Sequence, residues 1–156
     1  MPHINEKLDF TVEVFVVNKG KVLLRKHDKY ELWLGLGGHI DPGSDPTEAC
    51  HREAMEEAGI EIEIFPKPDE FGGAKDKELP APQFVNRHWI NDKHEHVAFI
   101  FFAKTDTDKV REPDNHEKSG GMKWFGAEDL DDPKYGIEPN VIHYAKTALE
   151  ASKLIF

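Results

Sequence analysis

Three glutamates at helical spacing are the residues of this chain with the clearest chemistry. Glu56 and Glu57 follow Glu53 by three and four positions, so in a helix their carboxylates are surface neighbours. Like charges this close repel, and near the C-terminal end of a helix the dipole adds a penalty of about 0.3–1 kcal/mol per anion. Hard divalent cations bind carboxylate oxygens, and Mg²⁺ commonly works beside substrate phosphates. The spacing predicts a divalent-metal site suited to phosphate chemistry; the simpler interpretation is a solvated acidic helix face.

The segment around these glutamates carries the start and stop signals of one helix. Asp45 is a capping residue type, Pro46 suits the first helical position, and Glu48 lies three residues beyond the cap. Gly59 is a typical helix stop. We therefore expect a helix between Asp45 and Gly59 that presents the three carboxylates in its last turns.

Upstream of this helix the chain is rich in glycine, which lets the backbone turn tightly and approach a ligand closely. The glycines are Gly35, Gly37, Gly38 and Gly43. We expect a loop here, with Gly37 and Gly38 as substrate-binding positions beside the carboxylates.

Together the glycine loop and the helix resemble the Nudix box. Its pattern is glycine, five residues, glutamate, seven residues, and then Arg-Glu-apolar-x-Glu-Glu-x-Gly-apolar. Gly38 fits the first glycine, and residues 52–60 fit the second half at the right spacing. The first glutamate of the pattern falls on Ser44, and either Asp45 or Glu48 is near enough to supply the missing carboxylate. The metal-binding core of the pattern is intact.

The resemblance implies a metal-dependent pyrophosphohydrolase. Its substrate would be a nucleoside diphosphate linked to another moiety, or a nucleoside triphosphate. Mg²⁺ or Mn²⁺ would be held by Glu53, Glu56 and Glu57. Arg52 would orient a carboxylate or contact phosphate, and Glu53 or a loop glutamate would take the proton of the attacking water. The departure at Ser44 leaves a second interpretation open, namely a Nudix-like nucleotide-binding module that has lost catalysis.

A glutamate on the loop before residue 122 is the other candidate for the proton acceptor, again by resemblance. Glu112 and Glu117 both qualify by residue type. Gly120 and Gly121 follow Glu117 and would allow that loop to move. We therefore expect Glu117 to be a catalytic residue.

Aromatic side chains near the expected cleft are candidates for contact with a nucleobase. Trp33 precedes the glycine loop, and Phe84 lies on a predicted strand that borders the cleft. Stacking of a base on such a ring is worth about 1–3 kcal/mol. The competing interpretation of each residue is packing in the core.

Histidines provide a rival signal. His94 and His96 are two positions apart in a predicted strand and so point to one face, an arrangement common in zinc sites. His39, His88 and His116 are candidates for further ligands. The sequence has no Cys-x-x-Cys or His-Glu-x-x-His motif to accompany them. The alternatives are that the pair flanks the substrate cleft or lies on the surface.

Hydrophobic patterning predicts an α/β fold with a mixed sheet between helices. The expected strands are 9–17, 21–25, 61–65, 83–90, 95–104 and 122–125, with a helical turn at 127–131 and a closing helix at 139–154. Residues 66–82 are expected to form a long loop because prolines and glycines interrupt them. This order agrees with the α/β/α sandwich that the Nudix resemblance implies.

Length, charge and cysteine use bound the class of protein. A chain of 156 residues suits one Nudix domain, which we expect to span 1–156. The net charge of −10 disfavours non-specific binding to nucleic acid or to an anionic membrane. The single cysteine, Cys50, is expected in the core, and neither a membrane span nor a signal peptide is visible. We expect a cytoplasmic protein acting on a small nucleotide, and a homodimer only because family members are often dimers.

Overall fold

Alternating strands and two amphipathic helices build the fold of the computed structural model, which describes residues 4–27, 30–112 and 120–155. The strands are β1 (Leu8–Asn18), β2 (Lys21–Lys26), β3 (Trp33–Leu34), β4 (Leu36–His39), β5 (Glu63–Phe65), β6 (Phe84–Asn91), β7 (His94–Lys104) and β8 (Met122–Phe125). The helices are α1 (Pro46–Ala58), α2 (Ala127–Leu130) and α3 (Pro139–Ile155), with a 3₁₀ turn η1 at Pro133–Tyr135. Among the described residues these strands form one eight-stranded sheet.

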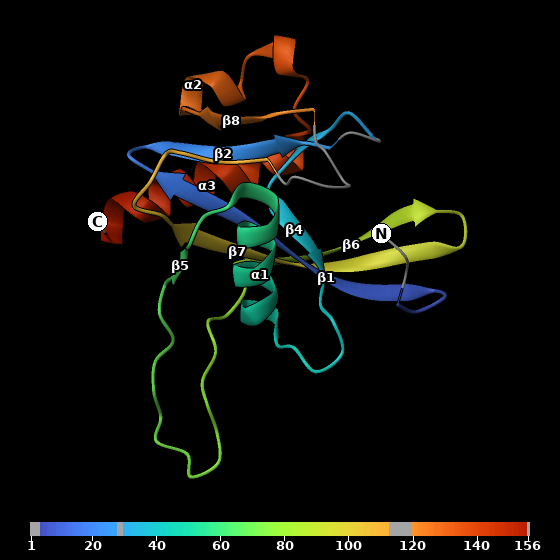
Figure 1. Cartoon of the computed structure of the whole chain (residues 1–156), viewed down its shortest axis with the longest axis vertical. Coiled ribbons are helices and arrows are strands. Elements are labelled where there is room, and N and C mark those ends of the chain that lie inside the picture. Colours follow the sequence, from blue (N-terminus) through green and yellow to red (C-terminus); the bar gives the residue numbers. More distant parts are fainter. Residues whose placement is uncertain (1–3, 28–29, 113–119, 156) are drawn as a thin grey trace.

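The long strands β1 and β7 run parallel at the centre of the sheet, in register from Leu8 opposite Glu95 to Val17 opposite Lys104. Beside β1, β4 pairs with its middle and β2 with its end, both antiparallel. Beside β7, β6 pairs with the first half and β5 with the end, also antiparallel. Both β3 and β8 pair with β2. The start of β1 and the β6–β7 hairpin therefore project together at one end of the molecule (Figure 1).

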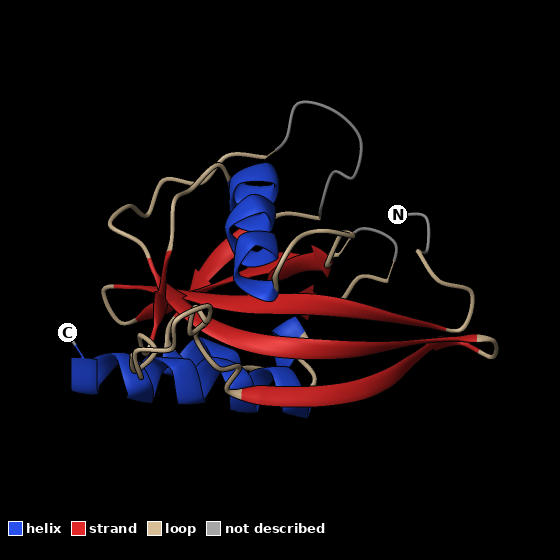
Figure 2. Ribbon diagram, turned by 90° about the horizontal axis from the view of Figure 1, so that it is seen from below, coloured by secondary structure: helices blue, strands red, loops and turns tan. Residues whose placement is uncertain are grey.

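One long helix covers each face of the sheet, as Figure 2 shows. Successive strand side chains point to opposite faces, so β1 contributes to two cores. On one face Val14 packs in a core that includes Ala54 of α1. On the other face Phe15 packs in a core that includes Ala145 of α3. The predicted α/β/α sandwich with a mixed sheet is confirmed.

The glycine segment differs from the loop that the sequence suggested. Four of its residues form β4, which pairs antiparallel with β1 and sets Gly37 opposite Glu13. A Cβ atom on Gly37 would lie 2.1 Å from the Val12 carbonyl oxygen. Glycine is therefore required here for close approach to the neighbouring strand, a contact that composition alone does not distinguish from a ligand contact.

The remaining elements form close to their expected positions, with ends shifted by one or two residues. The segment 66–82 has neither helix nor strand, as expected, and it hangs below the sheet in Figure 1. Cys50 is fully buried in the α1-side core. In the described part of the chain, each helix is too short or too polar to cross a membrane.

Candidate active site

Helix α1 begins and ends as its local sequence predicts. The Asp45 side chain accepts a hydrogen bond from the Glu48 backbone N–H at 2.8 Å, and the Glu48 carboxylate accepts one from the Asp45 N–H at 3.0 Å. These reciprocal bonds form a capping box. Gly59 ends the helix in the left-handed conformation, with φ of 67°. The caps fix which residues occupy the last two turns, where the glutamates lie.

Glu53 is buried and lies against the glycine segment. Glu53 is only 4% exposed to solvent, which is unusual for a residue with a carboxylate. A Cβ atom on Gly38 would lie 2.3 Å from Glu53 Oε1, so only glycine leaves space for the carboxylate in this position. The Nη2 atom of Arg52 lies 3.3 Å from the same oxygen. The predicted substrate-binding glycine therefore contacts the predicted metal ligand directly.

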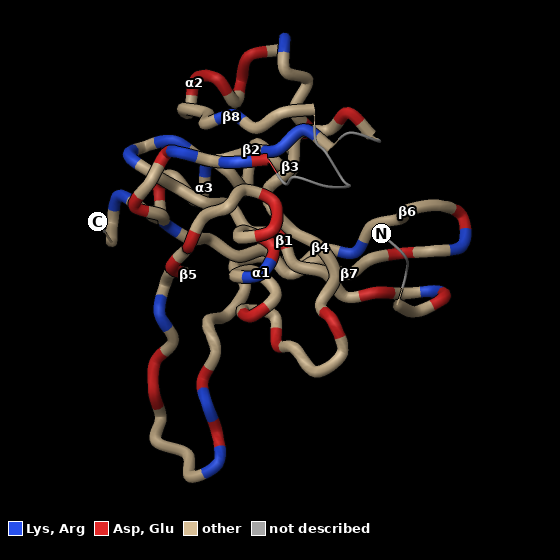
Figure 3. The backbone as a smooth tube through the Cα atoms, in the orientation of Figure 1, with Lys and Arg blue, Asp and Glu red and all other residues tan. Residues whose placement is uncertain are grey.

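Glu57 is held by the sheet. Its Oε1 accepts a hydrogen bond from the Gly37 backbone N–H at 2.7 Å. Its Oε2 lies 2.8 Å from Nη1 of Arg25, a residue of β2 that is itself 7% exposed. In Figure 3 acidic residues colour part of α1 and basic residues colour β2. Arg25 is a member of the site that the sequence did not reveal, because its contact with Glu57 depends on where β2 lies in the sheet.

Arg52 is the centre of a second polar group. Its Nη1 lies 3.0 Å from Asp41 Oδ2, and its Nη2 donates to the His39 carbonyl at 2.8 Å. Its Nε lies 3.9 Å from Glu56 Oε1. The planar guanidinium is thus held by partners on two sides, as suits a group that must keep one orientation.

The carboxylate outside the three glutamates that contacts Arg52 belongs to Asp41, and not to Asp45 or Glu48, the two residues that the sequence suggested. Asp45 and Glu48 form the capping box, whereas Asp41 lies two residues after β4 and reaches the arginine. Burial acts to raise the pKa of Asp45, but hydrogen bonds from Thr47 and Glu48 outweigh it, so the pKa lies below its ordinary value. Asp45 is therefore a helix-capping anion in this structure.

The three glutamates of the predicted metal site differ in exposure. Glu53 and Glu57 are largely buried, whereas the Glu56 side chain is 59% exposed. Among the described residues, no choice of one carboxylate oxygen from each glutamate brings all three oxygens within 4.8 Å of one another. The glutamates share the last turns of α1, as predicted, without forming a closed ligand set by themselves.

The remaining predicted site residues have different surroundings. Trp33 is half-buried, with its ring 5.1 Å from that of Phe125. Phe84 is also half-buried, with its ring 4.9 Å from that of Tyr144. Both therefore pack against the α3-side core. Glu117 and His116 lie outside the described residues.

The rival loop carboxylate lies near the end of α1. The backbone N–H of Arg111 donates to the Ala58 carbonyl at 2.9 Å, which attaches this loop to the helix. Glu112 is the next residue and is half-buried. This attachment brings the candidate to the end of α1 that also carries Glu57.

A further carboxyl group was missed by sequence reasoning. Glu13 lies on the β1 face that also carries Phe15, and a Cβ atom on Gly35 would lie 2.9 Å from its Cγ. Burial raises the pKa of Glu13 to about 7, even though a hydrogen bond from the Gly35 backbone acts to lower it. Glu13 was not among the site residues expected from the sequence, because its contacts depend on the pairing of β4 with β1.

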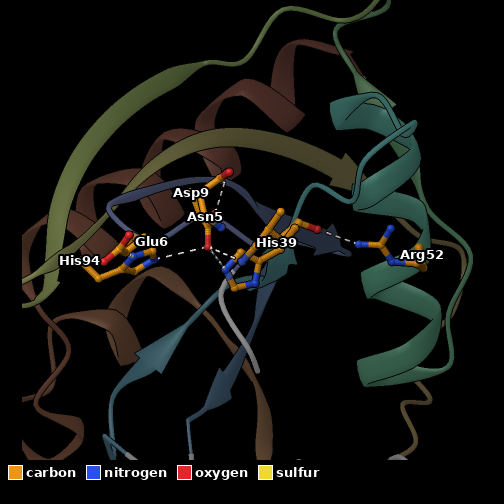
Figure 4. Close-up of polar contacts among 7 residues, drawn as sticks. Asn5, Glu6, Asp9, His39, Arg52 and His94 are labelled. Atoms are coloured by element: carbon orange, nitrogen blue, oxygen red, sulfur yellow. Dashed lines mark hydrogen bonds and ion pairs between the residues drawn. The ribbon is translucent and has the colours of Figure 1, made fainter.

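The histidines gather around Asp9 at the end of the sheet where β1 and β7 begin. His39 Nε2 lies 3.0 Å and His94 Nε2 lies 3.4 Å from Asp9 Oδ2 (Figure 4). The ring of His96 lies 5.0 Å from each of the other two rings. Burial, followed by the neighbouring positive charges, lowers the pKa of His96 to about 4. His94 is buried, so the prediction that the pair lies on the surface is wrong for it.

Comparisons with known proteins agree with this geometry. The NUDIX domain family model matches residues 7–145. A Nudix-family hydrolase from Clostridium perfringens is 34% identical, with a TM-score of 0.82 over 92% of this chain and 97% of that one. Two structures share the fold at lower identity. A MutT Nudix hydrolase from Burkholderia pseudomallei has 21% identity and a TM-score of 0.65, over 93% of this chain and 98% of that one. An Ap4A hydrolase from C. elegans has 18% identity and a TM-score of 0.63, over 96% and 99%.

No curated protein sequence matches the chain. The family model covers most of its length, and the Clostridium perfringens enzyme matches it almost from end to end. The α1 helix, with its capping box, its arginine and its glutamates, lies within the matched region. The chain therefore belongs to the Nudix family and is a Nudix-type hydrolase.

Proposed function

We propose that this hydrolase requires Mg²⁺ or Mn²⁺ and cleaves a phosphoanhydride bond in a nucleotide. The substrate is a nucleoside diphosphate linked to another moiety, or a nucleoside triphosphate. The observation that carries the proposal is the buried carboxylate of Glu53, which lies against Gly38 and beside Arg52. A buried carboxylate that serves only stability is costly, because removal of a charge from water is unfavourable.

The residues at the end of α1 fit a hard divalent cation. Glu53, Glu56 and Glu57 offer only carboxylate oxygens, the ligand type that Mg²⁺ and Mn²⁺ prefer. The Glu53 carboxylate lies against Gly38, at a distance that leaves no space for a larger side chain at position 38. When bound there, a divalent cation neutralises the charge that develops on the phosphate oxygens and lowers the pKa of the attacking water.

The residues of the chain then have distinct tasks. Arg52, held by Asp41 and the His39 carbonyl, keeps its guanidinium oriented toward the carboxylates. Arg25 and the Gly37 N–H hold Glu57 in one orientation. Either Glu53 or a glutamate of the loop that begins at Arg111 receives the proton of the attacking water at a carboxylate oxygen. Little covalent chemistry is required, because positioning and electrostatics carry phosphoryl transfer.

The wider setting is also a proposal. We infer that residues 1–156 act as one domain in the cytoplasm, in keeping with the buried free thiol of Cys50. The net charge of −10 favours a small nucleotide over bulk nucleic acid. A homodimer remains an expectation that rests on the family.

A substrate panel tests the proposal. Structures that share this fold include a MutT hydrolase, an Ap4A hydrolase and a UDP-X diphosphatase, so the panel should contain nucleoside triphosphates, dinucleoside polyphosphates and UDP-linked compounds. Release of phosphate or mononucleotide is measured with Mg²⁺, with Mn²⁺ and with a chelator. We expect turnover of at least one compound that the chelator abolishes.

Matched glutamine variants assign the metal site. Glu53→Gln and Glu57→Gln keep the shape of the side chain and one acceptor oxygen, although at position 57 the amide can serve only one of its two donors, Gly37 N–H and Arg25. The fold should survive while turnover and Mg²⁺ affinity fall. Glu128→Gln, at an exposed position on α2, is the control and should match the wild type. Turnover that persists in chelator, or in both α1 variants, would refute the metal assignment. Binding of nucleotides without any turnover would favour the inactive-module interpretation.

A further inference from the structure

A second group of ligand-type side chains lies apart from the α1 carboxylates. Asp9, His94 and His96 each offer one ligand atom, and these atoms all lie within 4.8 Å of one another. Asp9 on β1 pairs with His96 on the parallel strand β7, and His94 lies two residues earlier on the same face. Asp9 is 1% exposed and His94 is 3% exposed. Three strand positions therefore direct a carboxylate and two imidazoles into one buried space.

The Asp9 carboxylate is held firmly in this position. Its Oδ1 accepts hydrogen bonds from the Asn5 backbone N–H at 2.7 Å and from the Asn5 side-chain amide at 3.0 Å. Its Oδ2 accepts one from the Ile4 backbone N–H at 3.0 Å. His39 Nε2 also lies 3.0 Å from Oδ2. Metal-binding carboxylates are typically supported by outer hydrogen bonds of this kind.

The orientation of His94 is fixed by a carbonyl group. Its Nδ1 lies 2.8 Å from the Glu6 carbonyl oxygen. Because a carbonyl only accepts, this ring nitrogen must donate, and in the neutral imidazole the lone pair is then on Nε2. That Nε2 faces Asp9 Oδ2. Histidine ligands in metal sites commonly donate their other N–H to a carbonyl in this way.

The distance between these two atoms favours a metal ion over a shared proton. A normal N–H···O hydrogen bond is about 2.7–3.2 Å long. Tetrahedral zinc with bonds of about 2.0–2.1 Å separates its ligand atoms by about 3.4 Å. His94 Nε2 and Asp9 Oδ2 are 3.4 Å apart. His96 completes the set, since its ligand atom lies within 4.8 Å of both and needs a shift of at most about 1.4 Å.

We propose that Asp9, His94 and His96 bind a divalent transition-metal ion of the Zn²⁺ type. Imidazole nitrogens suit such ions better than Mg²⁺, so the site differs in preference from the α1 carboxylates. The ion would join the start of β1 to the start of β7. The His39 carbonyl accepts a hydrogen bond from Arg52, so the supporting residues also contact the Nudix helix (Figure 4).

Calorimetric titration of the chelator-treated protein with Zn²⁺ tests this site. An excess of Mg²⁺ is present throughout to occupy the α1 carboxylates. We expect one equivalent of Zn²⁺ to bind the wild type, and His96→Gln and Asp9→Asn to weaken binding at least about tenfold. His51→Gln removes an exposed imidazole from α1 and is the matched control, with affinity expected within about twofold of wild type.

A measurement on the wild type keeps the proposal testable if a variant fails to fold. Nitrogen-15 spectra of the imidazole rings should shift for His94 and His96 on addition of Zn²⁺, and should not shift for the exposed His51 and His143. The proposal is wrong if Zn²⁺ does not bind in excess Mg²⁺. It is also wrong if binding is lost in Glu57→Gln but kept in His96→Gln, or if only the exposed histidines shift.

Discussion

Replacement of Gly38 by alanine tests how closely the Glu53 carboxylate, the proposed metal ligand, is positioned. The new Cβ atom would lie 2.3 Å from Glu53 Oε1 and 2.7 Å from its Cδ, whereas ordinary contact starts near 3.4 Å. The carboxylate must therefore retreat by about 1 Å. The backbone at Gly38 has no positive φ, so alanine itself introduces no backbone strain. The change acts on one side chain.

A displacement of about 1 Å in a catalytic group can cost about 100-fold in rate, which corresponds to about 2.7 kcal/mol of barrier. We expect Gly38→Ala to lower Mg²⁺-dependent turnover by about that factor. The fold should survive, because the clashing atoms are the far end of a flexible side chain rather than backbone. Thermal unfolding should therefore change by only a few degrees, while turnover and Mg²⁺ affinity both fall.

The matched control is Gly126→Ala. A Cβ atom there meets only Asp129 Oδ2, at 3.8 Å, and φ is −77°, so alanine fits without displacement. Turnover is measured on the best compound of the substrate panel. If Gly38→Ala keeps turnover within about threefold of wild type, the position of Glu53 does not limit catalysis and the reasoning fails.

Four further substitutions test individual roles. Asp41→Asn removes the carboxylate that contacts the Arg52 guanidinium and should lower turnover about tenfold with Mg²⁺ affinity unchanged. If titration shows that Mg²⁺ affinity falls as well, Asp41 acts as a metal ligand instead. Asp45→Ala should cost about 1 kcal/mol in urea unfolding at pH 7. The pKa of Asp45 is lowered in the folded state, so the charged cap stabilises the fold above the unfolded-state pKa of about 3.9, and this stability is lost as pH falls through the folded-state pKa. If wild type and Asp45→Ala differ in unfolding free energy as much at pH 3 as at pH 7, the charge of the cap does not contribute. If the general base is Glu112 or Glu117, its replacement by glutamine should lower turnover about 10²–10⁴-fold while metal affinity stays nearly intact. If both variants lose less than about threefold in turnover, the base is a glutamate of α1.

The sequence by itself determined the parts of the site that depend on neighbours along the chain. The Asp45 cap, the Gly59 stop and the three-and-four spacing of the glutamates all act within one or two helical turns. The helix therefore forms where the sequence places it. The alternation of β1 likewise predicted strands between helices, because the period of a strand does not depend on its partners.

Only the tertiary structure decided which distant groups meet. Arg25 reaches Glu57 because β2 lies beside the end of α1, and Asp41 rather than Asp45 reaches Arg52 because β4 ends next to the helix. Asp9 and His94 come together through the parallel register of β1 and β7. Strand order and register arise from packing across the whole sheet, and a shift of one residue would turn every side chain of a strand to its other face. Local spacing along the chain therefore identified helix α1, whereas long-range packing selected the residues that surround it.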